Sequence, residues 1–247
     1  MADDSTPSDS AEQRARAHEP HDPGVAGRLN ALRAAVLGAN DGIVSTAGIV
    51  IGVAAAGAAR GEIFTAGLAG LTAGAMSMAV GEYVSVSTQR DTEKALLDKE
   101  RTELATMPVE EMAELAGLYE KKGLSRELAR EVAEQLHAHD ALAAHAEVEL
   151  NIDPDELTNP WQAAFASMVA FTAGALIPLL AILLAPEGTR TVVTVAAVII
   201  ALLLTGWVSA KLGDAPRLRA MLRVAGGGAL AMAVTYLIGL LFGTAVA

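Results

Sequence analysis

The feature that most constrains the fold is a set of long apolar runs with almost no charged side chains. A lipid hydrocarbon core is about 30 Å thick, and a helix needs roughly 20 apolar residues to cross it. Hydrophobic residues make up 52% of the chain, which agrees with a large lipid-facing surface. We therefore predict an all-α, polytopic membrane protein with five transmembrane helices, over residues 34–59, 63–81, 161–186, 191–210 and 224–247.

One charged residue, Asp41, lies inside the first apolar run. A carboxylate in the middle of a bilayer is energetically costly, and such residues usually mark an ion or substrate pathway. Asp41 therefore indicates a path for a cation. A second interpretation is compatible with the first: Asp41 lies between Asn40 and Gly42 and caps a break in the helix, as in many transporters.

Lysine and arginine in the short loops predict the orientation in the membrane, because these residues favour the cytosolic side. They gather on the side of the N-terminus and of the long segment between the second and third runs. We therefore expect this side to be cytosolic and the C-terminus to lie outside. The residues are Arg28, Arg33, Lys211, Arg217, Arg219 and Arg223.

Acidic residues are concentrated in one segment. Residues 91–156 hold 18 of the 29 acids and 7 of the 18 bases, so their net charge of −11 equals that of the whole protein. Residues 1–30 have no apolar core and are predicted to be a disordered cytosolic tail. The absence of cysteine excludes thiolate metal sites. The predicted domains are residues 1–30, the first two transmembrane helices (31–89), a cytosolic Glu-rich metal-binding domain (90–159) and the last three transmembrane helices (160–247).

Helix start and stop signals predict a three-helix bundle in the acidic segment. The second apolar run continues as a helix to Thr106, because no residue breaks it before Pro108. The further elements are a helix over 109–122 that ends at Gly123, a helix over 126–139 capped by Ser125, and a last stretch that begins at Asp140.

Carboxylates in this segment recur at helical spacing, which places each pair on one helix face. Neighbouring like charges repel, so a bound cation would stabilise them. Carboxylate oxygens with an imidazole suit a transition-metal dication. The alternative is a solvated surface, since charge runs usually face water. The pairs are Glu100 with Glu103, Glu111 with Glu114, and His145 with Glu149.

A rival metal-binding pattern is Glu134-x-x-His137, the ligand spacing of di-iron helix bundles. It occurs once, whereas those bundles use two copies. We therefore expect His137, like His139, to lie on a solvent-exposed helix face.

Three segments resemble the vacuolar iron transporter family, including its bacterial members. Residues 40–46 read Asn-Asp-Gly-Ile-Val-Ser-Thr, residues 73–86 read Ala-Gly-Ala-Met-Ser-Met-Ala-Val-Gly-Glu-Tyr-Val-Ser-Val, and Gln-Arg-Asp-Thr-Glu follows at 89–93. The resemblance extends from residue 33 to the C-terminus. It implies five transmembrane helices, a cytosolic three-helix metal-binding domain, a homodimer with the ion path between its subunits, and export of Fe²⁺ or Mn²⁺ from the cytosol in exchange for protons.

The same resemblance implies which residues bind metal. The family's acid in the first helix falls on Asp41 and its methionine in the second falls on Met78, whereas Met76 is two residues away and cannot face the same path. The cytosolic ligands fall on Glu100, Glu103, Glu111, Glu114 and Glu149.

The chain departs from the family pattern at two places. Some members carry a second-helix acid where this chain has Gly70, and the nearest acid here is Glu82, at the cytosolic end of the path. Members with a methionine pair in the last cytosolic helix match His145 and Ala146. We therefore predict Glu82 and His145 as additional metal ligands; the alternative for Glu82 is an ion pair with Arg90 at the cytosolic rim.

These observations predict a proton-coupled exporter of Fe²⁺ or Mn²⁺ in the plasma (inner) membrane. Asp41 and Met78 combine a hard and a soft ligand, which favours a transition metal over Ca²⁺ or Mg²⁺. The alternative is a membrane-tethered metal sensor or buffer, but a tether needs no intramembrane acid. An enzyme is not expected, since the five runs contain no histidine, lysine or arginine.

The expected partners are divalent metal ions, protons, the lipid bilayer and a second copy of the chain. No organic cofactor and no nucleic acid are expected. Glycines spaced four apart, which let helices approach closely in lipid, are compatible with the homodimer. They are Gly38 and Gly42, Gly48 and Gly52, and Gly70 and Gly74.

Overall fold

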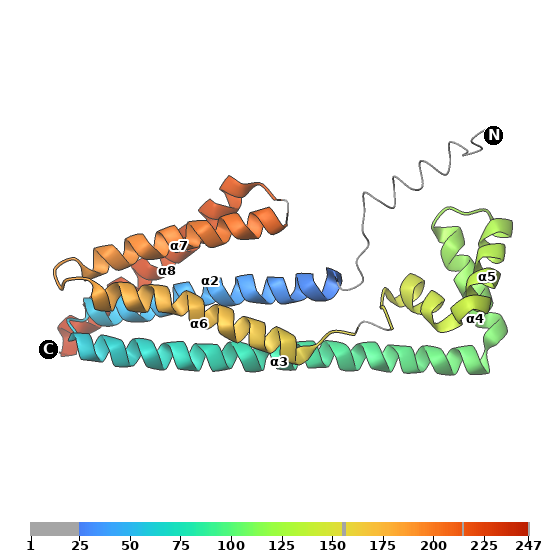
Figure 1. Ribbon diagram of the computed structural model, residues 1–247, viewed down its shortest axis with the longest axis horizontal. Helices are drawn as coiled ribbons and strands as arrows, with labels where there is room; N and C mark the ends of the chain where they lie inside the picture. The colour runs from blue at the N-terminus through green and yellow to red at the C-terminus, as the bar shows by residue number, and fades with distance from the viewer. Residues whose placement is uncertain (1–24, 155–156, 214, 247) are drawn as a thin grey trace, which may run out of the picture.

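The computed structural model describes residues 25–154, 157–213 and 215–246, and this part of the chain contains helices and no strand (Figure 1). The all-α prediction is confirmed. Residues 25–30 of the predicted tail belong to the first helix, and the rest of that tail lies outside the described residues. The elements are α2 (Val25–Ala55), α3 (Arg60–Thr106), α4 (Pro108–Lys121), α5 (Arg126–His145), the π-helix η1 (Ala146–Leu150), α6 (Pro160–Leu184), α7 (Arg190–Leu212) and α8 (Arg217–Val246).

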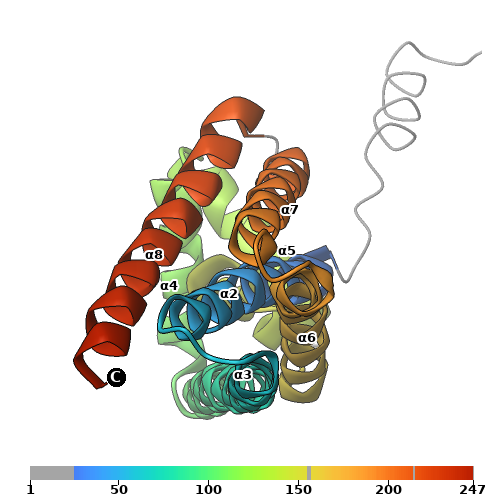
Figure 2. The ribbon, with the colours of Figure 1, turned by 90° about the vertical axis from the view of Figure 1, so that its left-hand side faces the viewer.

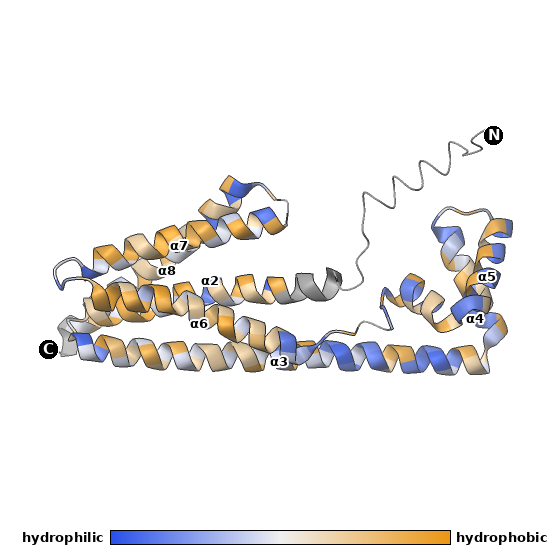
Figure 3. Cartoon of the chain, viewed as in Figure 1, coloured by the Kyte–Doolittle hydropathy of each residue, from blue (hydrophilic) through white to orange (hydrophobic). Residues whose placement is uncertain are grey.

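Five of these helices are long and apolar enough to cross a membrane, as the sequence predicts: α2, α3, α6, α7 and α8. They form a bundle in which α2 packs against each of the other four (Figure 2). Apolar residues cover this bundle, whereas polar residues predominate on the far half of α3 and on α4 and α5 (Figure 3). The fold thus consists of a membrane bundle and a smaller polar domain.

Small residues on α2 allow its close contacts with α6 and α8. A Cβ atom at Gly38 would lie 2.6 Å from the carbonyl oxygen of Ser167, and one at Gly52 would lie 3.1 Å from that of Thr235. Even a methyl group at Gly38 would therefore push α6 away. The small-residue faces of α2 are occupied within the chain, so they provide no argument for a homodimer.

The helix α3 connects the two parts of the molecule. Its 47 residues give it a length of about 70 Å at 1.5 Å per residue. Near its middle, Tyr83 contacts Trp161 at the start of α6, with ring centroids 4.7 Å apart. Such aromatic residues are typical of the membrane–water interface, so we expect the membrane boundary near Tyr83. The rest of α3 projects from this boundary and carries the polar domain at its end (Figure 1).

The polar domain has a small apolar core built around Leu115, Ala133 and Ala144. As predicted, α3 continues to Thr106, and Ser125 caps α5 by accepting a hydrogen bond from the Leu128 amide. The backbone then kinks at Asp140, whose φ of −156° and ψ of 98° lie outside the helical range. Its side chain accepts a hydrogen bond from the Ala143 amide at 2.9 Å and begins the predicted last stretch.

Candidate metal centre

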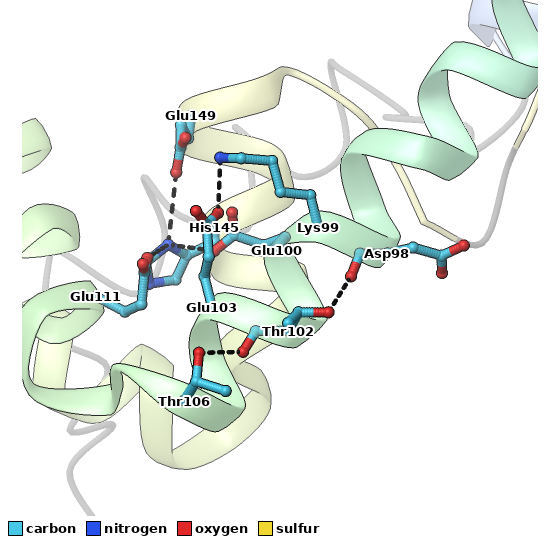
Figure 4. A network of polar contacts seen from close by, with 9 residues as sticks. All are labelled: Asp98, Lys99, Glu100, Thr102, Glu103, Thr106, Glu111, His145 and Glu149. Carbon is cyan, nitrogen blue, oxygen red and sulfur yellow. Dashed lines mark hydrogen bonds and ion pairs between the residues drawn. The ribbon is translucent and has the colours of Figure 1, made fainter.

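Three carboxylates converge on one imidazole nitrogen in the polar domain (Figure 4). The Nδ1 atom of His145 lies 2.9 Å from Oε1 of Glu100, 3.6 Å from Oε2 of Glu111 and 3.6 Å from Oε2 of Glu149. These residues come from α5, α3, α4 and η1, so four elements build the cluster. His145, Glu100 and Glu111 are buried, and the side chain of Glu149 is 27% exposed. We call these four residues the carboxylate–histidine cluster.

Local sequence explains how the four elements meet. Pro108, the first residue of α4, follows Met107, whose non-helical backbone ends α3 and turns the chain back. Glu111 therefore lies in the first turn of α4, where its negative charge interacts favourably with the helix dipole. The Asp140 kink then redirects α5, and the π-helix places Glu149 on the same side as His145.

Burial changes the protonation of the cluster. It raises the pKa of Glu100, and the neighbouring charge of Glu149 raises this pKa further, whereas His145 acts in the opposite direction. Burial also raises the pKa of Glu111, with a second contribution from Glu114. Glu100 and Glu111 therefore bind protons more readily than isolated glutamates. A dication would reverse this, because an opposite charge favours the ionised form.

Several polar atoms of the cluster have no hydrogen-bond partner among the described residues. Nε2 of His145 is buried and has none in this part of the chain, and the 2.9 Å contact between Nδ1 of His145 and Oε1 of Glu100 lacks hydrogen-bond geometry. A buried polar atom left unpaired costs about 1–3 kcal/mol. Ligand atoms of Glu100, Glu111 and His145 all lie within 4.8 Å of one another. A cation among them would pair with these atoms together after a small inward shift of the side chains, since metal–ligand distances are about 2.0–2.3 Å.

Two of the predicted glutamates lie at the rim of the cluster. Glu103 accepts a hydrogen bond from the ammonium group of Lys99 at 2.8 Å, and its side chain is 24% exposed. Glu114 is exposed, and its charge acts on Glu111. The structure thus brings all six predicted cytosolic residues into one region. The sequence analysis did not predict the ion pair between Lys99 and Glu103, although their i,i+4 spacing on one helix indicates it.

The predicted exposure of His137 is wrong. Its ring is half-buried and lies 6.1 Å from that of His145 between centroids, and its Nδ1 atom is buried. The kink at Asp140 brings the two histidines together, and straight helical spacing does not reveal this contact. His139 is exposed, as expected, and Glu134 is exposed as well.

Asp41 lies in the membrane bundle and is half-buried. The helix α2 runs without a break from Val25 to Ala55, so the interpretation of Asp41 as a helix cap is wrong. Its backbone carbonyl instead accepts a hydrogen bond from the Ser45 hydroxyl.

Two further predicted ligands, Met78 and Glu82, lie on α3, and both are half-buried. Met78 packs against the apolar cluster around Phe171, whereas Met76 is 57% exposed, so the two methionines face different surroundings. Glu82 adjoins Tyr83 at the membrane boundary. Seventeen residues separate Tyr83 from Glu100, or about 25 Å along the helix, so the membrane residues form a separate group from the carboxylate–histidine cluster.

Comparison with known proteins provides independent information on this arrangement. The sequence model of the VIT family matches residues 32–240. The vacuolar iron transporter of Acanthamoeba castellanii is 45% identical over 211 residues, which cover 85% of this chain and 78% of the relative. Vacuolar iron transporter homolog 2 of Arabidopsis thaliana is 38% identical over 206 residues, covering 83% and 81% of the two chains. The VIT-like transporter 1b of Glycine max is 35% identical over 210 residues, covering 85% and 75%.

Proposed function

The chain belongs to the VIT family, and from this membership we propose that it exports Fe²⁺ or Mn²⁺ from the cytosol in exchange for protons. The similarity to vacuolar iron transporters supports metal transport, with iron as a cargo. The convergence of three carboxylates on His145 is the observation that carries the proposal. Oxygen ligands with one nitrogen ligand suit these two ions.

In this proposal the polar domain, residues 90–159, collects the ion. Glu100, Glu111, Glu149 and His145 are its ligands, and the rim glutamates attract cations to them. The domain's large negative charge raises the local cation concentration. Because the cluster is about 25 Å from the membrane boundary, the ion must leave it before entering the membrane.

The membrane path in this proposal uses Glu82 at its entrance, followed by Met78 and Asp41. Asp41 and Met78 are only half-buried in the single chain, which is compatible with completion of the path by a second copy in a homodimer. A carboxylate that binds a dication gives up its proton. Asp41 therefore releases a proton when metal arrives and takes one when metal leaves.

The proposed orientation follows from the basic residues. The N-terminal end of α2, the α7–α8 loop and the polar domain lie toward the same end of the molecule (Figure 1). Lys211, Arg217, Arg219 and Arg223 place a cluster of basic residues in and near the short α7–α8 loop at this end, and basic residues in short loops favour the cytosolic side. We accordingly place the C-terminus outside and the protein in the plasma membrane.

Transport by the purified full-length protein in proteoliposomes tests the proposal. Fe²⁺ or Mn²⁺ should cross the membrane, and an imposed pH gradient should change the rate, with protons moving in the opposite direction. Empty liposomes are the control for leakage. Metal binding without flux at any pH gradient would instead establish a tethered sensor or buffer.

A further inference from the structure

His145 has two buried ring nitrogens, and the carboxylates surround only one of them. Its Nδ1 atom faces Glu100, Glu111 and Glu149, whereas Nε2 has no hydrogen-bond partner among the residues that the structure describes. A neutral imidazole that binds a metal through Nδ1 carries its proton on Nε2. Metal-binding histidines almost always donate this second N–H to an acceptor. A loaded centre therefore requires an acceptor near Nε2 of His145.

The ring of His137 lies where it can supply this acceptor. The two ring centroids are 6.1 Å apart and the ring planes make an angle of 73°. A direct N–H···N hydrogen bond would bring the centroids to about 5 Å, whereas one bridging water would leave them about 6–7 Å apart. The Nδ1 atom of His137 is buried and also lacks a hydrogen-bond partner in the described part of the chain. One water molecule would satisfy both nitrogens.

We propose that His137 is a positioning residue for the metal centre: through one bridging water, its Nδ1 atom accepts the Nε2–H of His145. This contact holds the tautomer in which the Nδ1 lone pair of His145 faces Glu100 and Glu111. Without it, the ring of His145 loses the contact that fixes its orientation, and its Nδ1 atom is held less firmly toward Glu100 and Glu111. The inference rests on the proposed role of His145 as a metal ligand and adds the residue that keeps His145 oriented for metal binding.

Three variants of the full-length protein in detergent micelles test the proposal, with Mn²⁺ as the probe. His137→Leu removes the acceptor, and His137→Gln restores one through its side-chain carbonyl. His139→Leu is the matched control, because His139 is exposed and lies two residues away on the same helix. Titration gives the affinity, and pulsed EPR of bound Mn²⁺ detects the ¹⁴N coupling of a histidine ligand.

His137→Leu should weaken Mn²⁺ binding about 10- to 100-fold, the range for loss of such an outer contact, and should reduce the ¹⁴N coupling. His137→Gln should recover most of both signals, and His139→Leu should leave both unchanged. If the leucine variant does not fold, His137→Phe, which keeps a flat ring without an acceptor, replaces it.

Two results would overturn the inference. One is wild-type affinity in His137→Leu. The other is weakened binding with an unchanged ¹⁴N coupling, since His137 would then stabilise the domain without orienting His145. A separate variant, His145→Ala, distinguishes failure of the proposed metal centre: if it binds Mn²⁺ like the wild type, His145 is not a ligand at all.

Discussion

The polar domain and the membrane bundle differ in how completely one chain assembles its candidate ligands. In the polar domain, Glu100, Glu111 and His145 bring their ligand atoms within 4.8 Å of one another. In the bundle, Asp41 and Met78 lie on different helices, both half-buried, and Met78 packs against an apolar cluster. The candidate ligands of the first group already lie together, whereas in the proposed function those of the second are completed by a second copy or by a rearrangement.

This difference has a physical origin. Water and the small apolar core let the polar domain bury a few glutamates whose repulsion a cation then relieves. A preformed, empty acidic site in lipid would be far more costly, since no water compensates its charge. Under the proposed function, capture of the ion belongs to the polar domain and its translocation to the membrane bundle. Variants of each region should therefore fail in different ways.

The largest effect is expected for Asp41→Asn, which keeps the side-chain shape but removes its charge and its proton site. Metal flux and coupled proton movement in proteoliposomes should both fall to the level of empty liposomes, while Mn²⁺ binding by the polar domain stays unchanged. Asp91→Asn, at an exposed acid on α3, is the matched control. Normal flux in Asp41→Asn would show that this residue has no part in coupling.

The double variant Glu100→Gln and Glu111→Gln should affect the opposite step. Two charge-assisted contacts are worth roughly 3 kcal/mol together, which corresponds to about 100-fold weaker binding. Calorimetric titration of the full-length protein with Mn²⁺ measures this loss. Flux should fall at low metal concentration and recover at high concentration, because the membrane path is intact. A loss of flux that high metal concentration does not restore would contradict the separation of the two regions.

The sequence predicts the helices of these two regions but not all of the contacts between them. Apolar length alone predicts the five membrane helices, and helical spacing predicts that Glu100, Glu103, Glu111 and Glu114 share faces. The contact between His137 and His145 was not predictable, because it depends on the backbone kink at Asp140. The sequence also does not show whether Gly38 and similar glycines pack within one chain or between two copies, because a small residue allows close helix contacts in either case.

Met78→Leu should reduce transport several-fold without changing assembly, because leucine keeps the volume and removes only the thioether. The soft sulfur favours Fe²⁺ over Mn²⁺, so the ratio of the two fluxes should shift toward Mn²⁺. Met76→Leu is the control, since this exposed side chain has different surroundings. An equal shift in both variants would mean that the methionines act through packing.

The raised pKa values of Glu100 and Glu111 predict a pH dependence of stability. Between the ordinary glutamate range and these raised values, the folded state binds more protons than the unfolded state. The metal-free polar domain should therefore lose stability as pH rises through this window. In thermal unfolding of the full-length protein, the transition of this domain should shift downward by a few degrees, and Glu100→Gln should reduce the shift. An upward shift of the unfolding temperature over the same pH window would contradict the burial of Glu100 and Glu111 in their protonated form.

The smallest effect is expected at the rim, where Lys99 competes with a metal ion for Glu103. Their ion pair is exposed, and such pairs contribute little to stability. Lys99→Gln removes the competing charge and frees the carboxylate, so Mn²⁺ should bind about two- to threefold more tightly. Lys94→Gln, at an exposed lysine on the same helix, changes the net charge equally and serves as the control. An identical gain in both variants would show that only overall charge matters, whereas a gain confined to Lys99→Gln would identify Glu103 as part of the ion's approach to the carboxylate–histidine cluster.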